Sequence, residues 1–501
     1  MVEMGYWRRK PFTGPIVALT VRRPFPPTNR LLWLLACFTF VIYLLSGPVF
    51  LVYDGAIMYR VSESLLWHHS LRITDPFLHI NEPYATYGLA LPVMILPLVA
   101  VGQFLLHDGT RLLSIYQPAI TAATVLVVAL IAREIGLRWR TSVGVALLYG
   151  FATVAWYYSN ILFSEPLVGL ATALAFYSLM RFKRELSLRW LVVAGCAVAL
   201  ACLARTDSIA LTLLPVSAYV MATVILRAVG WRERLSLGSA YGIPVAAAGV
   251  VVLAHDWIRY GSILKTGYGA SGMDFSFPFL RGLYGLLLSP AAGIFVFIPV
   301  MLLSVVGFPQ FLQRYRGEAL LLAGLVGARL IFYASWYGWD GGESWGPRFL
   351  VPILPLLVLP IAFLPAWVRP RFSLIALGGL SLLIQLLGQL VSYYSFSIWT
   401  IRALPADLSL PSCTTCGVRS AVAMQAAKNI LDFDWANAPM LDQLLILFRY
   451  GPVRRSWGFP LVALAFLLVV GAGIWLGLRL LKSIDRGNAS RSELATVRGA
   501  A

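Results

Sequence analysis

The sequence predicts an all-α polytopic membrane protein, a bundle of about twelve transmembrane helices. Of its 501 residues, 59% are hydrophobic and only 12% are charged, whereas a soluble globular chain carries about 25% charged residues. The hydrophobic residues form long runs, many of them near the roughly 20 residues that an α-helix needs to span a bilayer core. Arg and Lys gather in the stretches between these runs, which is typical of a protein that crosses the membrane many times.

A membrane protein of this class is also expected to carry a positive charge such as the formal net charge of +18 found here. Basic residues collect in the cytoplasmic loops of membrane proteins and attract anionic lipid. We therefore expect membrane lipids as partners and no nucleic acid. The first apolar run begins near Leu31, after a basic stretch, and is too long for the apolar part of a signal peptide. It predicts a retained anchor helix behind a cytoplasmic tail.

Thirteen apolar runs are candidate helices. They are 31–52, 87–106, 112–132, 141–159, 163–180, 190–204, 209–226, 236–254, 286–308, 319–337, 349–367, 372–396 and 458–481. The loop charges decide which of them cross. The basic groups between the runs are Arg133/Arg138/Arg140, Arg181/Lys183/Arg184/Arg189, Arg227/Arg232/Arg234, Arg314/Arg316, Arg369/Arg371 and the tail from Lys482 to Arg498.

All of these groups fall on the cytoplasmic side only if the run 87–106 does not cross. That run holds Pro92 and Pro97, which fit poorly in a plain spanning helix. We expect it to be an interfacial or re-entrant helix within the first outer loop. About twelve crossings then remain, with both termini in the cytoplasm.

This topology divides the chain into four parts. They are a cytoplasmic basic tail (1–30), a transmembrane catalytic module that includes the outer loop 53–111 (31–370), C-terminal transmembrane helices with the outer loop 397–457 (371–482), and a disordered cytoplasmic tail (483–501). Cys413 and Cys416 lie in the last outer loop, where two neighbouring cysteines most simply form a disulfide.

Asp54 follows the first predicted helix directly and is the leading candidate for chemistry. The run from Asp54 to His69 predicts an amphipathic helix lying on the membrane, with one side formed by Ile57, Val61, Ser64 and Leu65. A carboxylate at such a boundary loses part of its hydration, which raises its proton affinity and suits a general base. A solvated loop aspartate or a helix N-cap is the alternative.

Two short outer turns carry further charges. Ser164-Glu165-Pro166 reads as an ordinary helix start, in which Ser caps and Pro is tolerated, but the topology places Glu165 on the same face as Asp54. Arg205 lies in the other turn, although basic residues are disfavoured outside. It either pairs locally with Asp207 or binds an anionic group.

The stretch 336–348 combines three Trp, four Gly, two acids and Arg348. Flat aromatic rings with carboxylates suit sugar binding, and an arginine can hold a phosphate with two parallel hydrogen bonds. An aromatic belt with a snorkelling arginine is the alternative. Lys265 adds a cation in the loop 255–285, and Arg329 lies inside an apolar helix, where we expect it to face the bundle interior.

Together these motifs resemble the GT-C superfamily of membrane glycosyltransferases. The resemblance spans about residues 31–370 and rests on the acid after the first helix and on four stretches: AREIGLRWR, SNILFSEPL, RYGSILKTGYG and WDGGESWGPRFLVPILP. It is greatest to bacterial members related to protein O-mannosyltransferases and aminoarabinose transferases. Relatives often have Asp where Glu165 stands, and a Pro-rich segment where this chain has EPYATYG (82–88).

The resemblance implies transfer of a sugar, with inversion, from a polyprenyl-phosphate donor to a hydroxyl of a glycan, lipid or protein. The reaction would take place on the extracytoplasmic face of a bacterial plasma membrane. Asp54 and Glu165 would be the catalytic acids, and the cations for the donor phosphate would be Arg205, Lys265, Arg329 and Arg348. The expected substrate-binding residues are Tyr59, Arg60, Glu82, Tyr84, Tyr87, Tyr268, Trp339, Asp340, Glu343 and Trp345. No cofactor is required, although a divalent metal ion (Mg or Mn) could assist.

Two alternatives remain at this stage: a transporter or flippase for a lipid-linked or small polar substrate, and a non-catalytic subunit of an envelope-assembly complex. Transporters usually bind their substrate near the bilayer midplane. In this chain the ionisable residues cluster at the predicted outer ends of the helices, with Arg329 as the main exception. That distribution favours chemistry at the membrane surface.

Overall fold

The computed structural model describes residues 29–73, 83–228, 230–268, 274–342, 344–368, 370–391, 393, 432–451 and 471. These residues form helices and contain no strand; two isolated β-bridges join Phe50 to Ile161 and Arg72 to Tyr84. The first half of the bundle consists of α1 (Asn29–Leu45), α2 (Tyr53–His68), α3 (Ala90–Leu106), α4 (Leu113–Glu134), α5 (Trp139–Phe151), α6 (Ala155–Tyr158), α7 (Glu165–Glu185), α8 (Leu188–Ala204), the π-helix η2 (Ile209–Leu213), α9 (Leu214–Thr223) and the 3-10 turn η3 (Ile225–Arg227). The second half consists of α10 (Trp231–Tyr260), α12 (Phe279–Leu288), α13 (Ile294–Phe297), α14 (Met301–Arg314), α15 (Arg316–Ser335), η4 (Arg348–Ile353), α16 (Leu354–Leu357), η5 (Leu359–Phe363), α17 (Pro370–Leu390), η6 (Trp435–Asn437) and α20 (Pro439–Tyr450).

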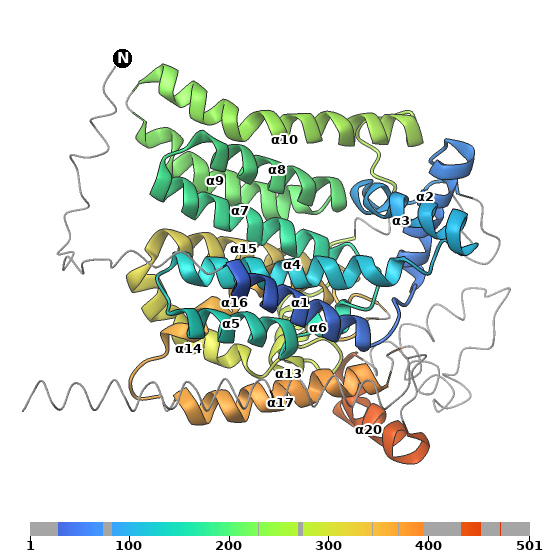
Figure 1. The fold of residues 1–501 in the computed structure, drawn as a ribbon, viewed down its shortest axis with the longest axis vertical. Helices are drawn as coiled ribbons and strands as arrows, with labels where there is room; N and C mark the ends of the chain where they lie inside the picture. The colour runs from blue at the N-terminus through green and yellow to red at the C-terminus, as the bar shows by residue number, and fades with distance from the viewer. Residues whose placement is uncertain are drawn as a thin grey trace, which may run out of the picture.

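The long helices run side by side in one bundle (Figure 1). α7 lies between α4 and α8, and α10 packs along the other side of α8. α1 and α5 pack against α4, and α15 packs against α12 and α14. The start of η4 lies against α7, which places the predicted sugar-binding stretch beside the SNILFSEPL turn.

Five helical segments within the described residues are long and apolar enough to cross a membrane: 113–134, 209–227, 231–260, 316–335 and 372–390. α10 has 30 residues, which corresponds to about 45 Å at 1.5 Å per residue. Shorter apolar helices, α1, α3 and α8 among them, accompany these five. The all-α polytopic membrane fold is therefore confirmed. Of the run 458–481, the structure describes only residue 471.

Two predicted helices are broken into pieces. The run 349–367 forms η4, α16 and η5 instead of one helix, because Pro352, Pro355 and Pro360 each remove a backbone donor that a continuous α-helix needs. The run 286–308 is split between α12, α13 and α14 for the same reason, with Pro290 and Pro299 at the two breaks. Hydrophobicity predicted each of these runs as one membrane-spanning helix, but it did not predict the breaks at the prolines.

The helices of the predicted first outer loop lie at one end of the bundle, on the right in Figure 1. α2 matches the expected amphipathic helix: Ile57, Val61 and Ser64 are buried, and Leu65 packs against their cluster. α3 packs mainly on α2 and less on α4 and α8. The turns after α4, α7, α9 and α14, which carry the basic groups, lie at the opposite end. Which end faces the cytoplasm stays a prediction.

Candidate functional site

The turn between α6 and α7 brings the start of α2 against the start of α7. The backbone N–H of Phe50 donates to the carbonyl oxygen of Asn160 at 2.8 Å, and the N–H of Leu162 donates back to Phe50 at 3.3 Å. These two bonds fasten the segment before α2 to the SNILFSEPL turn. As a result, Asp54 in the first turn of α2 lies close enough to Glu165 at the start of α7 for both to bond to the same arginine, Arg348.

Gly55 makes this close approach possible. A Cβ atom at position 55 would lie 2.4 Å from the carbonyl oxygen of Leu162, well inside van der Waals contact. Only glycine, which has no Cβ, lets the backbone of α2 come so near the turn. The residue next to Asp54 therefore sets the distance between the two predicted catalytic acids.

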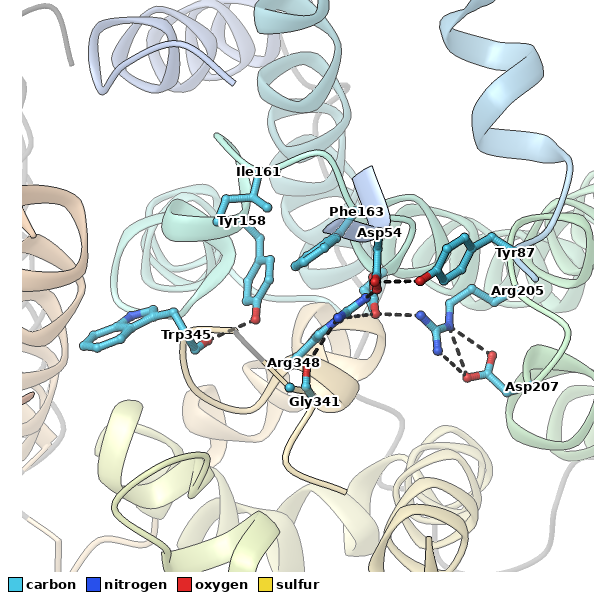
Figure 2. A network of polar contacts seen from close by, with 12 residues as sticks. Asp54, Tyr87, Tyr158, Ile161, Phe163, Arg205, Asp207, Gly341, Trp345 and Arg348 are labelled. Carbon is cyan, nitrogen blue, oxygen red and sulfur yellow. Dashed lines mark hydrogen bonds and ion pairs between the residues drawn. The ribbon is translucent and has the colours of Figure 1, made fainter. Parts of the chain in front are cut away.

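Asp54 is bonded to two partners, one on each carboxylate oxygen. Its Oδ1 accepts a hydrogen bond from the hydroxyl of Tyr87 at 2.6 Å, and its Oδ2 accepts one from Nη2 of Arg348 (Figure 2). The Asp54 side chain keeps 18% of its surface exposed, so one side of the carboxylate can still be reached.

Glu165 is buried and joins two arginines. Its Oε1 accepts from Nη1 of Arg205 at 2.6 Å and from Nε of Arg348 at 2.7 Å. Its Oε2 has no hydrogen-bond partner among the described residues. Ser164 makes no capping hydrogen bond, so the expectation that it caps α7 was wrong. Glu165 does lie in the first turn of α7, where the positive end of the helix dipole favours a carboxylate.

Arg348 connects the two acids. Besides its bonds to Asp54 and Glu165, it donates from Nη1 to the carbonyl oxygen of Gly341 at 3.2 Å. Its guanidinium carbon lies 3.8 Å from the ring centre of Phe163, within the range of a cation–π contact. Arg348 is therefore fixed within the bundle end and does not snorkel toward a lipid interface.

Arg205 forms the local ion pair that the sequence suggested, and it also reaches Glu165. Its Nη2 donates to Oδ2 of Asp207 at 2.8 Å, and its Nε lies 3.1 and 3.2 Å from the two oxygens of the same carboxylate. Asp207 in turn accepts a hydrogen bond from the hydroxyl of Tyr333 in α15. We refer to Asp54, Glu165, Arg205, Asp207 and Arg348 as the acid–arginine cluster.

The cluster changes the expected acidity of Asp54. Burial alone would raise the pKa of this carboxyl, but the charge of Arg348 and the hydrogen bonds from Tyr87 and Arg348 lower it below the ordinary value. The expected rise in proton affinity is therefore wrong, because a cation outweighs the loss of hydration. Asp54 is a carboxylate at neutral pH, the form that can accept a proton.

Tyr87 and Tyr268 are the predicted substrate-binding residues that lie at the cluster. Tyr87 bonds to Asp54. Tyr268 interacts electrostatically with Arg205, Asp207 and Asp54, and burial raises the pKa of its hydroxyl to about 12. Both phenols are therefore protonated at neutral pH and available as hydrogen-bond donors.

Of the other two predicted phosphate-binding cations, Arg329 adjoins the acid–arginine cluster and interacts electrostatically with Asp207, Arg205 and Glu165. Lys265 is exposed, with its Nζ 5.1 Å from the ring centre of Tyr260. Arg329 is buried and faces the bundle interior as expected, where Nη2 lies 3.3 Å from the hydroxyl of Thr212. Arg205 and Arg348, by contrast, donate hydrogen bonds directly to Glu165. The cluster thus contains Arg205 and Arg348.

Most of the other predicted substrate residues have different partners. Tyr59 and Arg60 both donate to Glu63, each at 2.6 Å, and Tyr84 accepts from Arg72 at 3.1 Å.

The residues of the stretch 336–348 divide between core and turn. Trp339 and Trp345 are fully buried against Phe277 and Phe297 respectively, and Asp340 accepts from the backbone N–H of Gly342 at 3.1 Å. The two rings pack in the hydrophobic core, away from solvent. Glu82, Glu343, Cys413 and Cys416 lie outside the described residues.

Sequence reasoning overlooked the aromatic residues that hold the arginines. Tyr333 stacks on Phe349 with ring centres 4.2 Å apart, and Phe163 lies under Arg348. One signal was available: Tyr333 follows Arg329 by four residues, so the two lie on the same face of α15. An intramembrane arginine indicates a buried polar face on its helix, so a tyrosine on the same face is a candidate residue of the functional site.

A small pocket opens beside the cluster. Its walls include Met58 from α2, Ala85 and Tyr87 from the segment that leads into α3, Pro92 from α3, and Arg259 from α10. It is mostly apolar and reaches Tyr87, which contacts Asp54.

The described residues do not fit a divalent metal ion. No group of three or more His, Cys, Asp or Glu side chains comes together in this part of the chain. Asp54 and Glu165 are both bonded to arginine, which repels a second cation. A metal ion therefore has no assigned ligands, and no step proposed below runs through one.

No family model matches the chain, and no curated protein matches it significantly. Among solved structures, it is similar to two crystal structures of ArnT from Cupriavidus metallidurans, one bound to undecaprenyl phosphate and one in the apo state. Each is 16% identical, aligns over 90% of this chain and 76% of the ArnT chain, and gives a TM-score of 0.46.

Proposed function

We propose that the chain is a glycosyltransferase that moves a sugar from a polyprenyl-phosphate donor to a hydroxyl acceptor on the extracytoplasmic membrane face. The observation that carries the proposal is the position of Arg348, which bonds at once to Asp54 and to Glu165. Three acids and two arginines in one largely buried cluster suit a reaction that removes a proton and releases a phosphate. The sequence motifs of the resemblance support the same reaction.

The two acids would have different roles, because their access differs. Asp54 is 18% exposed and Glu165 only 1%. Asp54 can therefore meet an acceptor hydroxyl and serve as the general base. Glu165 shares Oε1 between Arg205 and Arg348, and its negative charge allows two guanidinium groups to stay side by side. Glu165 would hold the arginines in place.

Arg205 and Arg348 would bind the donor phosphate. Both guanidinium carbons lie 5.7 Å from the ring centre of Phe349, so one aromatic ring supports both cations. Arginine suits this role because its planar donor group matches phosphate oxygens. A polyprenyl chain would stay in the lipid while its phosphate meets the protein at the end of the bundle.

The proposed step is a single displacement. The acceptor oxygen bonds to the anomeric carbon, and the bond from that carbon to the phosphate oxygen breaks with its electron pair leaving on the phosphate. The hydroxyl proton passes to Asp54. Arg205 and Arg348 stabilise the negative charge that develops on the phosphate, and the configuration at the anomeric carbon inverts.

Arg348→Lys tests the role of Arg348. Lysine keeps the charge but cannot bond to Asp54 and Glu165 in the same geometry. A hydrogen bond to a charged group contributes about 1.5–3 kcal/mol, so we expect transfer to fall by about 10- to 100-fold. The measurement is label incorporation from a labelled polyprenyl-phosphate sugar into extracted envelope acceptors, using membranes that contain the protein.

Arg111→Lys is the matched control, because Arg111 is exposed and pairs only weakly with Asp108 at 3.3 Å. It should transfer sugar like the wild type. Equal rates for Arg348→Lys and the wild type would contradict the proposed role. Uptake of a solute into vesicles without any lipid-linked donor would favour a transporter instead.

A further inference from the structure

We propose that Tyr333 is a positioning residue that, through Asp207, orients Arg205 toward the phosphate of a lipid-linked donor. This inference rests on the proposed function and adds a residue that does not touch the substrate. It starts from a chain of contacts that runs from Glu165 through Arg205 and Asp207 to Tyr333.

Asp207 determines how the guanidinium of Arg205 is turned. The carboxylate contacts both Nε and Nη2, at 3.1 and 2.8 Å. Contact along one edge of the planar group fixes its rotation. The other terminal nitrogen, Nη1, then points to Glu165 at 2.6 Å. Without Asp207, Arg205 would keep one strong bond and could turn about it.

Arg205 still has donors to offer. A guanidinium has five N–H groups, and the bonds to Asp207 and Glu165 engage one on each of its three nitrogens. One N–H on each terminal nitrogen is left without a hydrogen-bond partner among the described residues. Two such donors are what a phosphate needs for a pair of parallel hydrogen bonds.

Tyr333 holds Asp207 from the opposite side. Its hydroxyl donates to the same Oδ2 that accepts from Arg205. Its ring cannot move freely, because it stacks on Phe349 at 4.2 Å with an interplanar angle of 9° and meets Trp336 edge-on at 6.0 Å. A rigid ring with a buried hydroxyl therefore fixes the position of Asp207.

The stack also connects Tyr333 to the rest of the cluster. Phe349 follows Arg348 directly in the sequence, and its ring lies 5.7 Å from the guanidinium carbon of Arg205. Tyr333 thus contacts two residues that hold Arg205: Asp207 through a hydrogen bond and Phe349 through ring stacking. Replacement by phenylalanine removes the first contact and keeps the second.

The proposal has a consequence for pH dependence. The groups around Asp207 are Arg205 in its own turn, Tyr333 and Arg329 in α15, Cys202 in α8 and Tyr268. Burial would raise the pKa of Asp207, but Arg205 and the hydroxyl of Tyr333 lower it below the ordinary value. Loss of that hydroxyl moves the pKa upward, so Asp207 becomes protonated and releases Arg205 at a higher pH.

The test compares Tyr333→Phe with Tyr43→Phe in the purified full-length protein. Tyr43 is also buried and donates one hydrogen bond, to the carbonyl oxygen of Gly150 at 2.9 Å, but it lies between α1 and α5. We expect Tyr333→Phe to bind a long-chain polyprenyl phosphate about tenfold more weakly than the wild type. As the pH is lowered, this variant should also lose binding at a higher pH than the wild type does. Tyr43→Phe should match the wild type in both respects.

Three results separate the possible failures. If Tyr333→Phe and Tyr43→Phe bind alike at every pH while the wild type transfers sugar, the proposed function stands and the positioning role is wrong. If the wild type neither binds polyprenyl phosphate nor transfers sugar, the function fails and this inference fails with it. A loss of binding that accompanies an equal loss of thermal stability in both variants would also overturn the positioning role.

Discussion

At the scale of single residues, Asp54 and Glu165 show what the sequence can and cannot predict. Their place at the starts of two helices was predicted from the local residue patterns, and their place on one face of the membrane from the loop charges. Their partners were not, because Arg348 lies 294 positions from Asp54 and 183 from Glu165. The acidity of Asp54 depends on that distant cation. A reading limited to the neighbours of Asp54 in the chain therefore predicted the wrong direction of its pKa.

The lowered pKa values predict how stability depends on pH. Asp54 and Asp207 have their pKa values lowered in the folded protein. Their ion pairs therefore contribute fully above the ordinary value near 3.8, and this contribution is lost as the pH falls through the lowered values. Thermal unfolding in detergent should show a midpoint unaffected by these groups from pH 7 to about pH 5, with a fall below about pH 4.

Asp207→Asn provides the comparison for this prediction. Removal of one partner of a buried ion pair costs about 3–5 kcal/mol, so the variant should unfold at a lower temperature at pH 7. Its unfolding midpoint should also fall less on acidification than that of the wild type, because an asparagine at position 207 cannot be protonated as Asp207 can. An unchanged midpoint at pH 7 together with the full acid-side fall would contradict the pairing of Asp207 with Arg205.

At the scale of helices, the hydrophobic pattern predicted the regular helices correctly but did not predict the breaks that proline introduces. α2 was predicted with its buried side, since Ile57 and Val61 recur at helical spacing. The run 349–367 was predicted as one helix because its hydrophobicity is continuous, but the structure has three short pieces there, η4, α16 and η5. This irregular path leaves Arg348 at the start of η4, beside α7.

Gly55→Ala tests whether the contact between α2 and the SNILFSEPL turn sets the site. The added Cβ would lie 2.4 Å from Leu162, so α2 must shift and Asp54 must move away from Arg348. We expect a loss of about 1–3 kcal/mol of stability and sugar transfer that is lower by about tenfold or more.

Gly242→Ala is the control for this substitution, because position 242 in α10 has open space around it. It should be neutral or slightly stabilising, since alanine is a better helix former than glycine. Equal activity of Gly55→Ala and Gly242→Ala would show that the close contact at Gly55 does not position Asp54.

At the scale of the whole molecule, charge separates the two ends of the bundle. The basic turns lie at one end, and the acid–arginine cluster, α2 and α3 lie at the other. Loop charges alone predicted this division, because the same rule acts on every turn. The contact between Asp207 and Tyr333 was beyond such reasoning, since it spans 126 positions and depends on how α15 packs against the turn after α8. The loop 397–431 lies outside the described residues.

The transfer activity of Asp54→Asn tests the central claim most directly. Asparagine keeps the size of the side chain but cannot accept the hydroxyl proton, so it removes general-base catalysis, which contributes about 10²- to 10⁴-fold. Asp274→Asn is the control, because Asp274 is a half-buried turn residue whose Oδ1 accepts a hydrogen bond from the neighbouring backbone N–H of Ser276. With a labelled polyprenyl-phosphate sugar, Asp54→Asn should transfer at least about 100-fold more slowly than the wild type, and Asp274→Asn should transfer normally. Transfer by Asp54→Asn at the wild-type rate would contradict the account.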